Sequence, residues 1–73
     1  MQSFDQALAV IAGVMCDGVA KHPDNEWTRR SIEYHLGRAE EHLRLLREGE
    51  QLGDHLAHAA TRLLMALTLR EIG

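Results

Sequence analysis

Histidine and arginine recur at helical spacing in two separate segments of the chain. Positions i, i+3 and i+7 share one face of an α-helix, and two sets of residues have this spacing: His35, Arg38 and His42, then His55, His58 and Arg62. An antiparallel hairpin turning at Glu50 and Gln51 would bring His42 beside His58 and Arg38 near Arg62. The sequence therefore predicts a cationic seam between two helices, called here the His/Arg seam: Arg38, His42, His55, His58 and Arg62.

Three hypotheses fit the His/Arg seam. Its guanidinium and imidazole groups could bind a phosphate or another anion, with arginine favoured because it donates two parallel hydrogen bonds. Alternatively, His42, His58 and the carboxylate of Asp54 could bind a transition-metal ion, since imidazole and carboxylate are common ligands. In the third hypothesis the histidines only cap helices or form hydrogen bonds at an interface. The HExxH zinc motif is absent, and the three hypotheses stay open.

Acidic residues give little support for catalysis. A magnesium-dependent nucleotide pyrophosphatase holds its metal with several carboxylates one helical turn apart, whereas Glu50 and Asp54 form the only such pair in the sequence. If the chain is an active enzyme, these two are the expected catalytic residues and Mg²⁺ the expected cofactor. Otherwise we expect no cofactor or metal. Cys16 is the only cysteine, which excludes an intrachain disulfide and a CxxC zinc site.

Three helices are expected to position these residues. The chain is rich in Leu, Ala, Glu and Arg and has one proline, a composition that favours helix. We predict an all-α fold in a single domain, residues 1–73, with three antiparallel helices over about 3–20, 29–48 and 54–71. The run His22-Pro23-Asp24-Asn25 should separate the first two helices, and Gly49 should end the second. The predicted N-caps are Thr28 or Ser31 for the second helix and Asp54 for the third.

Apolar positions predict a packing face on each helix. These faces are Phe4, Leu8, Ile11 and Met15; Ile32, Leu36, Ala39, Leu43 and Leu46; and Leu56, Ala59, Ala60, Leu63 and Leu67. The third helix is also apolar elsewhere, at Leu64, Met65 and Leu69, and two neighbouring helices of so small a chain can hardly cover every side. The sequence therefore predicts a homo-oligomer, a dimer or larger, completed through these three residues. The alternative is a central helix in a three-helix bundle.

Size and charge limit the classes of function. A chain of 73 residues buries little surface by itself, and its net charge of −3 argues against sequence-independent DNA binding. No apolar run is long enough for a membrane span and no signal peptide is indicated, so we expect a cytoplasmic protein. Trp27, Arg29 and Arg30 lie in a polar context and are candidates for partner contact. Their alternative roles are closing the end of the bundle and ordinary solvated charge.

Short motifs follow one another along most of the chain. They are Ala20-Lys21-His22-Pro23-Asp24-Asn25-Glu26-Trp27, Tyr34, Ala39, His42-Leu43, Gly49-Glu50 and His55-Leu56-Ala57-His58-Ala59-Ala60. In this order and spacing they resemble a phage family, the N-terminal domain of dATP/dGTP diphosphohydrolase, over about residues 7–69. The resemblance implies an oligomeric helical protein of a phage or prophage, linked to purine nucleotide metabolism. Its matched positions here are Trp27, His42, Glu50, His55 and His58.

The chain departs from the family pattern most clearly in an acidic loop, which is shortened here to Gln51-Leu52-Gly53-Asp54. Because expected metal ligands are lost, the leading hypothesis is a phage module in the host cytoplasm that binds a nucleotide or another phosphate-bearing ligand at the His/Arg seam, without diphosphohydrolase activity. One alternative is an anti-defence protein, such as an anti-CRISPR, that inhibits a host protein by direct binding. The other is an active Mg²⁺-dependent dNTP pyrophosphatase.

Overall fold

The computed structural model describes residues 3–21 and 25–73, and this part of the chain is helical without strands. The helices are α1 (Asp5–Lys21), the short 3₁₀ helix η1 (Glu26–Arg29), α2 (Ile32–Arg47) and α3 (His55–Ile72). The predicted all-α fold with three main helices is confirmed. The predicted break at His22-Pro23-Asp24 lies outside the described residues.

Local sequence signals set the ends of α2 and α3. The Ser31 hydroxyl accepts a hydrogen bond from the Tyr34 N–H at 3.0 Å, and the Asp54 carboxylate accepts one from the Ala57 N–H at 3.1 Å. Each side chain thereby satisfies a backbone donor that the first turn of a helix leaves free. Gly49, just after α2, has a φ of +82°, a left-handed conformation that glycine adopts without strain.

The start of α2 differs from the prediction. Asn25 adopts the left-handed conformation, with φ of +52°, and its carbonyl accepts hydrogen bonds from the Thr28 N–H at 3.0 Å and the Thr28 hydroxyl at 2.8 Å. These bonds close η1 as a separate turn, so α2 begins at Ile32 and its N-cap is Ser31 rather than Thr28.

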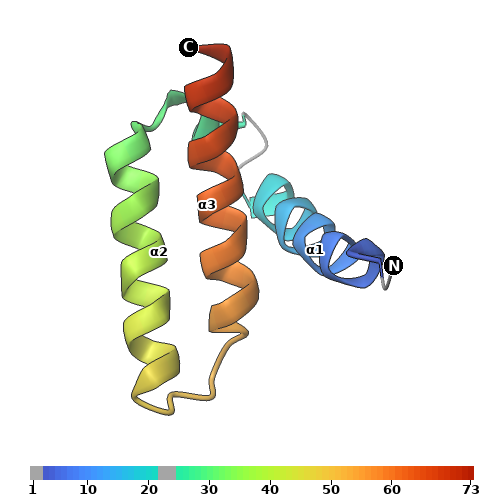
Figure 1. Ribbon diagram of the computed structural model, residues 1–73, viewed down its shortest axis with the longest axis vertical. Coiled ribbons are helices and arrows are strands. Elements are labelled where there is room, and N and C mark those ends of the chain that lie inside the picture. The colour runs from blue at the N-terminus through green and yellow to red at the C-terminus, as the bar shows by residue number, and fades with distance from the viewer. Residues whose placement is uncertain (1–2, 22–24) are drawn as a thin grey trace.

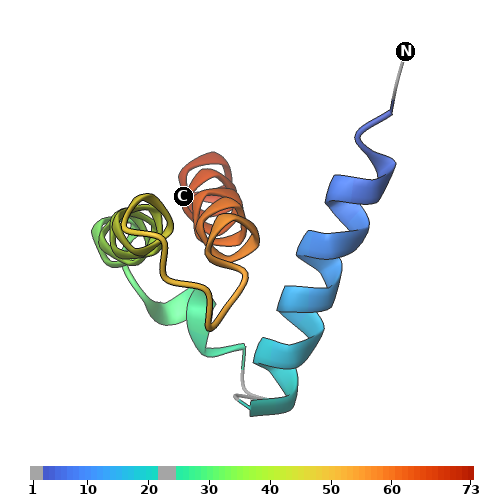
Figure 2. The ribbon, with the colours of Figure 1, turned by 90° about the horizontal axis from the view of Figure 1, so that it is seen from below.

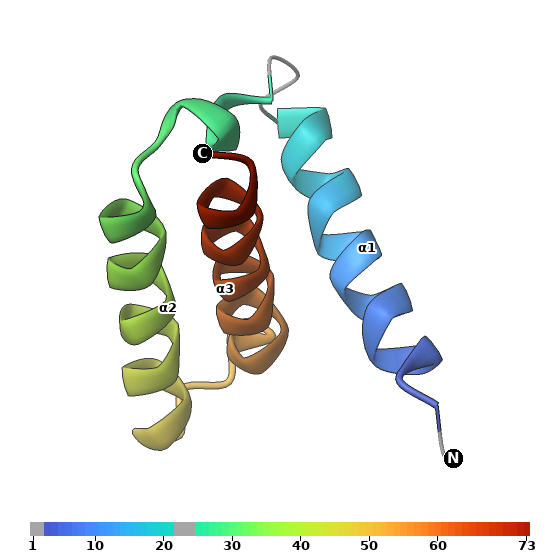
Figure 3. The same cartoon turned by 45° about the horizontal axis from the view of Figure 1, so that its top comes forward.

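α3 is the central element of the fold. α2 runs antiparallel beside it, and α1 lies on its other side, inclined to the pair (Figures 1 and 2). In the described residues α1 and η1 both contact α3, whereas α1 makes no contact with α2. Figure 3 shows η1 between the α1 side of the molecule and the start of α2, and η1 packs against α3. No described helix is long and apolar enough to cross a membrane.

Small and polar residues, rather than leucines, fill the contact between α2 and α3. The buried residues there include Ala39, Ala59 and Ala66 together with the histidines His35 and His55. The predicted packing faces are confirmed at Ala39 and Ala59, but the buried side of each helix is turned by about one residue, so that His35 and His55 are buried in place of leucines. Leucines assigned to those faces stay accessible: Leu56, Leu63 and Leu67 are 60%, 47% and 46% exposed. Alanine lets two helix backbones approach closely, and this favours the observed rotation.

α1 is the least buried helix. None of its residues is buried, although Ile11, Val14 and Met15 are half-buried. Phe4 and Leu8, at the other end of the predicted face, remain exposed. Only the carboxyl-terminal part of that face is therefore covered by the rest of the chain.

Candidate functional site

His35 is completely buried and links α2 to both η1 and α3. One ring nitrogen, Nε2, lies 2.9 Å from the Trp27 carbonyl oxygen, and the other, Nδ1, lies 3.1 Å from a guanidinium nitrogen of Arg62. These partners fit a neutral imidazole in which Nε2–H donates and Nδ1 accepts. His35 therefore holds the Arg62 guanidinium in place relative to η1.

Sequence reasoning left His35 out of the candidate site. Its side chain also makes edge-on ring contacts with Trp27 and Tyr34, at centroid distances of 6.4 and 5.6 Å. The available signal was its spacing: His35, Ala39 and His42 follow the i, i+4, i+7 pattern of a packing face.

Arg62 is half-buried and carries its charge without a carboxylate partner among the described residues. Its guanidinium contacts His35, the sulfur of Met65 at 4.0 Å and the ring of Tyr34 at 5.7 Å, and none of these groups is an anion. Loss of hydration lowers the pKa of Arg62; Tyr34 opposes this shift, and the positive charges of neighbouring arginines add to it. An anion placed beside Arg62 would compensate this charge.

Three histidines meet at the opposite end of the α2–α3 pair. His55 is hydrogen-bonded through Nε2 to the carboxylate of Glu50, and its Nδ1 lies 3.1 Å from Nδ1 of His42. The ring of His42 stacks on that of His58 at a centroid distance of 5.1 Å. The structure therefore brings together the histidines that the predicted hairpin placed side by side.

The charges around His42 are mostly positive. Loss of hydration lowers the pKa of His42, and the nearby positive charges of His58, Arg38, His55 and Arg62 lower it further. Arg38 is exposed and forms no ion pair in the described residues, and its charge also lowers the pKa of Arg62. Arg38 is therefore close enough for its positive charge to lower the pKa of both His42 and Arg62.

Glu50 and Asp54 both accept hydrogen bonds from other residues of the chain. Glu50 is held by His55 and by the Leu52 N–H at 2.6 Å, and the hydrogen bond from His55 is the main reason that its pKa is lowered. Asp54 caps α3. Within residues 3–21 and 25–73, no three His, Cys, Asp or Glu side chains are grouped so that they could hold a metal ion. The same observation gives no support to the metal hypothesis for His42, His58 and Asp54.

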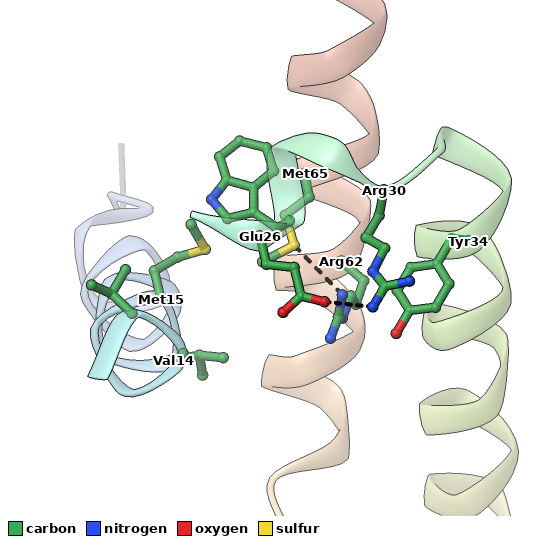
Figure 4. Close-up of a pocket in the computed structure, with 10 residues that line it drawn as sticks. Val14, Met15, Glu26, Arg30, Tyr34, Arg62 and Met65 are labelled. Carbon is green, nitrogen blue, oxygen red and sulfur yellow. Dashed lines mark hydrogen bonds and ion pairs between the residues drawn. The ribbon is translucent and has the colours of Figure 1, made fainter. Parts of the chain in front are cut away.

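A cavity of about 200 Å³ opens next to Arg62, between α1, η1 and the α2–α3 pair. Its walls combine aromatic, thioether and charged side chains: Trp27, Tyr34, Met15, Met65, Glu26, Arg30 and Arg62. Figure 4 shows the head groups of Glu26, Arg30 and Arg62 converging there. Arg30 pairs with Glu26 at 2.5 Å and lies 4.9 Å from the centre of the Tyr34 ring. Arg62 therefore belongs to both the His/Arg seam and this cavity.

Three of the residues predicted for partner contact, Trp27, Arg30 and Met65, line the same cavity. Arg29 is exposed. Leu64 is exposed, whereas Leu69 is half-buried. Met65 and Leu69 share the helical side of His58 and Arg62 through i, i+4, i+7 and i+11 spacing, and Leu64 lies on a different side.

Comparison with known proteins gives one family. The family described as dATP/dGTP diphosphohydrolase, N-terminal, matches residues 2–73, which confirms the resemblance seen in the motifs. No curated protein matches the chain, and no solved structure matches it.

Proposed function

The chain belongs to the family of dATP/dGTP diphosphohydrolase N-terminal domains, and on that premise we propose that it binds a nucleotide or a similar phosphate-bearing ligand at the His/Arg seam. In this proposal Arg38, His42, His58 and Arg62 contact the phosphate, and His55 positions His42. The protein acts as a phage-encoded binder in the host cytoplasm.

The observation that carries the proposal is the charge of Arg62. A half-buried guanidinium loses hydration, and burial of a charge is costly unless an opposite charge compensates it. None of its contacts supplies that charge within the described residues. A phosphate accepts two parallel hydrogen bonds from arginine, so it suits this position better than a neutral ligand does.

The adjoining cavity supports an organic phosphate over a free inorganic one. Its volume of about 200 Å³ exceeds the roughly 150 Å³ that encloses a benzene molecule in a protein interior. Trp27 and Tyr34 offer faces or edges against which a flat ring can pack. A ligand with a ring attached to a phosphate could therefore use both the cavity and the seam.

The arrangement supports binding better than hydrolysis. The only candidate catalytic carboxylates, Glu50 and Asp54, already bond to His55, Leu52 and Ala57. Diphosphohydrolase activity would need carboxylates free to hold Mg²⁺, and in our proposal the chain has lost that activity.

Calorimetric titration with dATP, dGTP, a cyclic dinucleotide and inorganic phosphate tests the proposal. We expect at least one nucleotide to bind, and Arg38→Ala or Arg62→Ala to weaken its binding by about tenfold or more, because each removes a charge-assisted hydrogen bond. Arg47→Ala is the matched control: Arg47 is exposed at the end of α2, outside the seam, and its loss changes the net charge equally.

Two results would contradict the proposal. If no compound of the panel binds, the seam is not a nucleotide site and direct binding to a host protein becomes the better hypothesis. If Arg47→Ala weakens binding as much as Arg38→Ala does, the attraction comes from overall charge. Release of pyrophosphate in the presence of Mg²⁺ would show that activity is retained, and its persistence in Glu50→Ala and Asp54→Ala would exclude those residues from catalysis.

A further inference from the structure

Side chains spaced about one helical turn apart lead away from the cavity along both α2 and α3. In order from the cavity they are Tyr34, Arg38 and His42 on α2, and Met65, Arg62 and His58 on α3. Because the two helices are antiparallel (Figure 1), both series run in the same direction and end where the rings of His42 and His58 stack. The cavity is therefore continued by a line of arginine and histidine side chains.

The first helix does not cover this line of side chains. The carboxyl-terminal half of α1 contributes Val14 to the cavity beside Arg62. Its amino-terminal half contributes Val10 to an apolar groove with Leu56, which lies on a different side of α3 from His58 because the two are only two residues apart. His58 is accordingly exposed. A ligand seated in the cavity can extend along the line toward His58.

An aromatic platform stands at each end of the line. Trp27 and Tyr34 form the first one, in the wall of the cavity. The stacked rings of His42 and His58 form the second, and since His42 covers only one face of the His58 ring, a nucleobase can stack on the other. An imidazole stacks through its face and hydrogen-bonds through its edge, so His58 can contact a base and a phosphate together.

Two uncompensated positive charges lie between the platforms. The guanidinium groups of Arg38 and Arg62 have no carboxylate partner within residues 3–21 and 25–73, whereas Arg30 is paired with Glu26. Arg38 is close enough to Arg62 for its charge to lower the pKa of that group, so each charge opposes the other in the unliganded chain. A phosphodiester carries a single negative charge and matches one guanidinium.

We propose that the ligand is a dinucleotide, a molecule with two bases and two phosphate groups, and this inference rests on the proposed function. Its first base packs against Trp27 and Tyr34. Its two phosphates bond to Arg62 and Arg38, and its second base stacks on His58. A mononucleotide leaves the second platform empty, and a nucleoside triphosphate brings more negative charge than two guanidinium groups offset.

Calorimetric titration of the full chain with AMP, dATP, cyclic di-AMP and the linear dinucleotide pApA tests the proposal. AMP and cyclic di-AMP carry nearly the same net charge at about pH 7.5, because a phosphate monoester is then mostly a dianion. We expect at least one dinucleotide to bind about tenfold or more tightly than both AMP and dATP, since it gains a second charge-assisted contact and a second stacked base. The comparison of the two dinucleotides shows whether the ring or the open chain is preferred.

Two variants separate the second half of the site from the first. Arg38→Ala and His58→Ala should each weaken dinucleotide binding by about tenfold, and should weaken AMP binding much less, because AMP reaches only the cavity and Arg62. Both side chains are exposed, so the variants should fold. Arg47→Ala, outside the seam at the end of α2, is the matched control for charge and should bind both ligands as the wild type does.

The possible results are distinct. If AMP or dATP binds as tightly as both dinucleotides, or if Arg38→Ala weakens AMP and dinucleotide binding equally, the dinucleotide proposal is overturned while nucleotide binding at the seam stands. If dinucleotide affinity is unchanged in His58→Ala, no base stacks on that ring, and the proposal is also overturned. If none of the four compounds binds, the proposed function fails together with this inference.

Discussion

Two buried histidines organise the two ends of the α2–α3 pair, and they differ in what they bond. His35 lies between a backbone carbonyl, that of Trp27, and a cation, Arg62. His55 lies between a carboxylate, that of Glu50, and a second histidine, His42. His35 is therefore bonded to a hydrogen-bond acceptor and a hydrogen-bond donor. His55 is bonded to an anion and to a second imidazole ring.

The difference shows how one residue type serves two purposes. At the His35 end the partners fit one neutral tautomer, because a proton on Nδ1 would point at the Arg62 guanidinium. At the His55 end the Nδ1 atoms of His42 and His55 face each other, and a proton on either one completes the hydrogen bond between them. We infer that the first end fixes the position of Arg62, whereas at the second end His42, whose pKa is lowered mainly by loss of hydration, can couple a proton to a ligand.

The largest expected effect comes from removing the histidine at the fixed end. His35→Ala should lower the free energy of unfolding by about 3 kcal/mol, because it opens a cavity and leaves the Trp27 carbonyl and the Arg62 guanidinium without their buried partner. His55→Ala should cost less, about 1–2 kcal/mol, because water can reach its partners. Urea unfolding followed by circular dichroism measures both losses.

His58→Ala is the control for these two substitutions. His58 is exposed and its ring stacks on that of His42, so its loss should change the free energy of unfolding by no more than about 0.5 kcal/mol. A cost for His55→Ala equal to or above that of His35→Ala would remove the proposed difference between the two ends.

The same two ends explain what the sequence could and could not predict. The roles of Ser31, Gly49 and Asp54 at helix ends could be predicted from the sequence, because caps depend on local backbone geometry. The contact between His42 and His58 followed from the length of the hairpin. The sequence could not predict which face of α2 turns toward α3. Leu36 and Leu43 on one face and His35 and His42 on the next have the same spacing, so periodicity does not distinguish the two faces. A buried histidine needs partners, and those of His35 come from positions 8 and 27 residues away.

A smaller effect compares the helix caps at the two ends. Ser31 caps α2 near His35, and Asp54 caps α3 near His55. Ser31→Ala and Asp54→Ala should each lower the free energy of unfolding by about 1 kcal/mol, with Asp54→Ala costing slightly more because a carboxylate also interacts favourably with the helix dipole. Asp54→Asn keeps the cap without the charge and should recover most of the loss in urea unfolding. If it recovers nothing, the charge rather than the hydrogen bond stabilises this end.

The smallest effect concerns protons at His42, and it tests whether the second end titrates. Arg38 and Glu41 face His42 from α2, and His55, His58 and Arg62 face it from α3. Because the pKa of His42 is lowered on folding, the unfolded chain takes up its proton first as the pH falls through about 6.5. His42 therefore makes the protein less stable as the pH falls from about 7.5 to 5.5, whereas Glu50, whose pKa is lowered, stays ionised in that range.

Two measurements follow from this linkage. His42→Gln should reduce the downward shift of the urea midpoint between about pH 7.5 and 5.5, and an unchanged shift would mean that His42 does not titrate as its surroundings indicate. A bound anion favours the protonated ring, so sulfate, which stays a dianion over this range, should bind more tightly to the wild type at the lower pH. His42→Gln should lose part of this gain. Sulfate binding that is independent of pH would make the two ends of the α2–α3 pair alike, because neither would then couple a proton to a ligand.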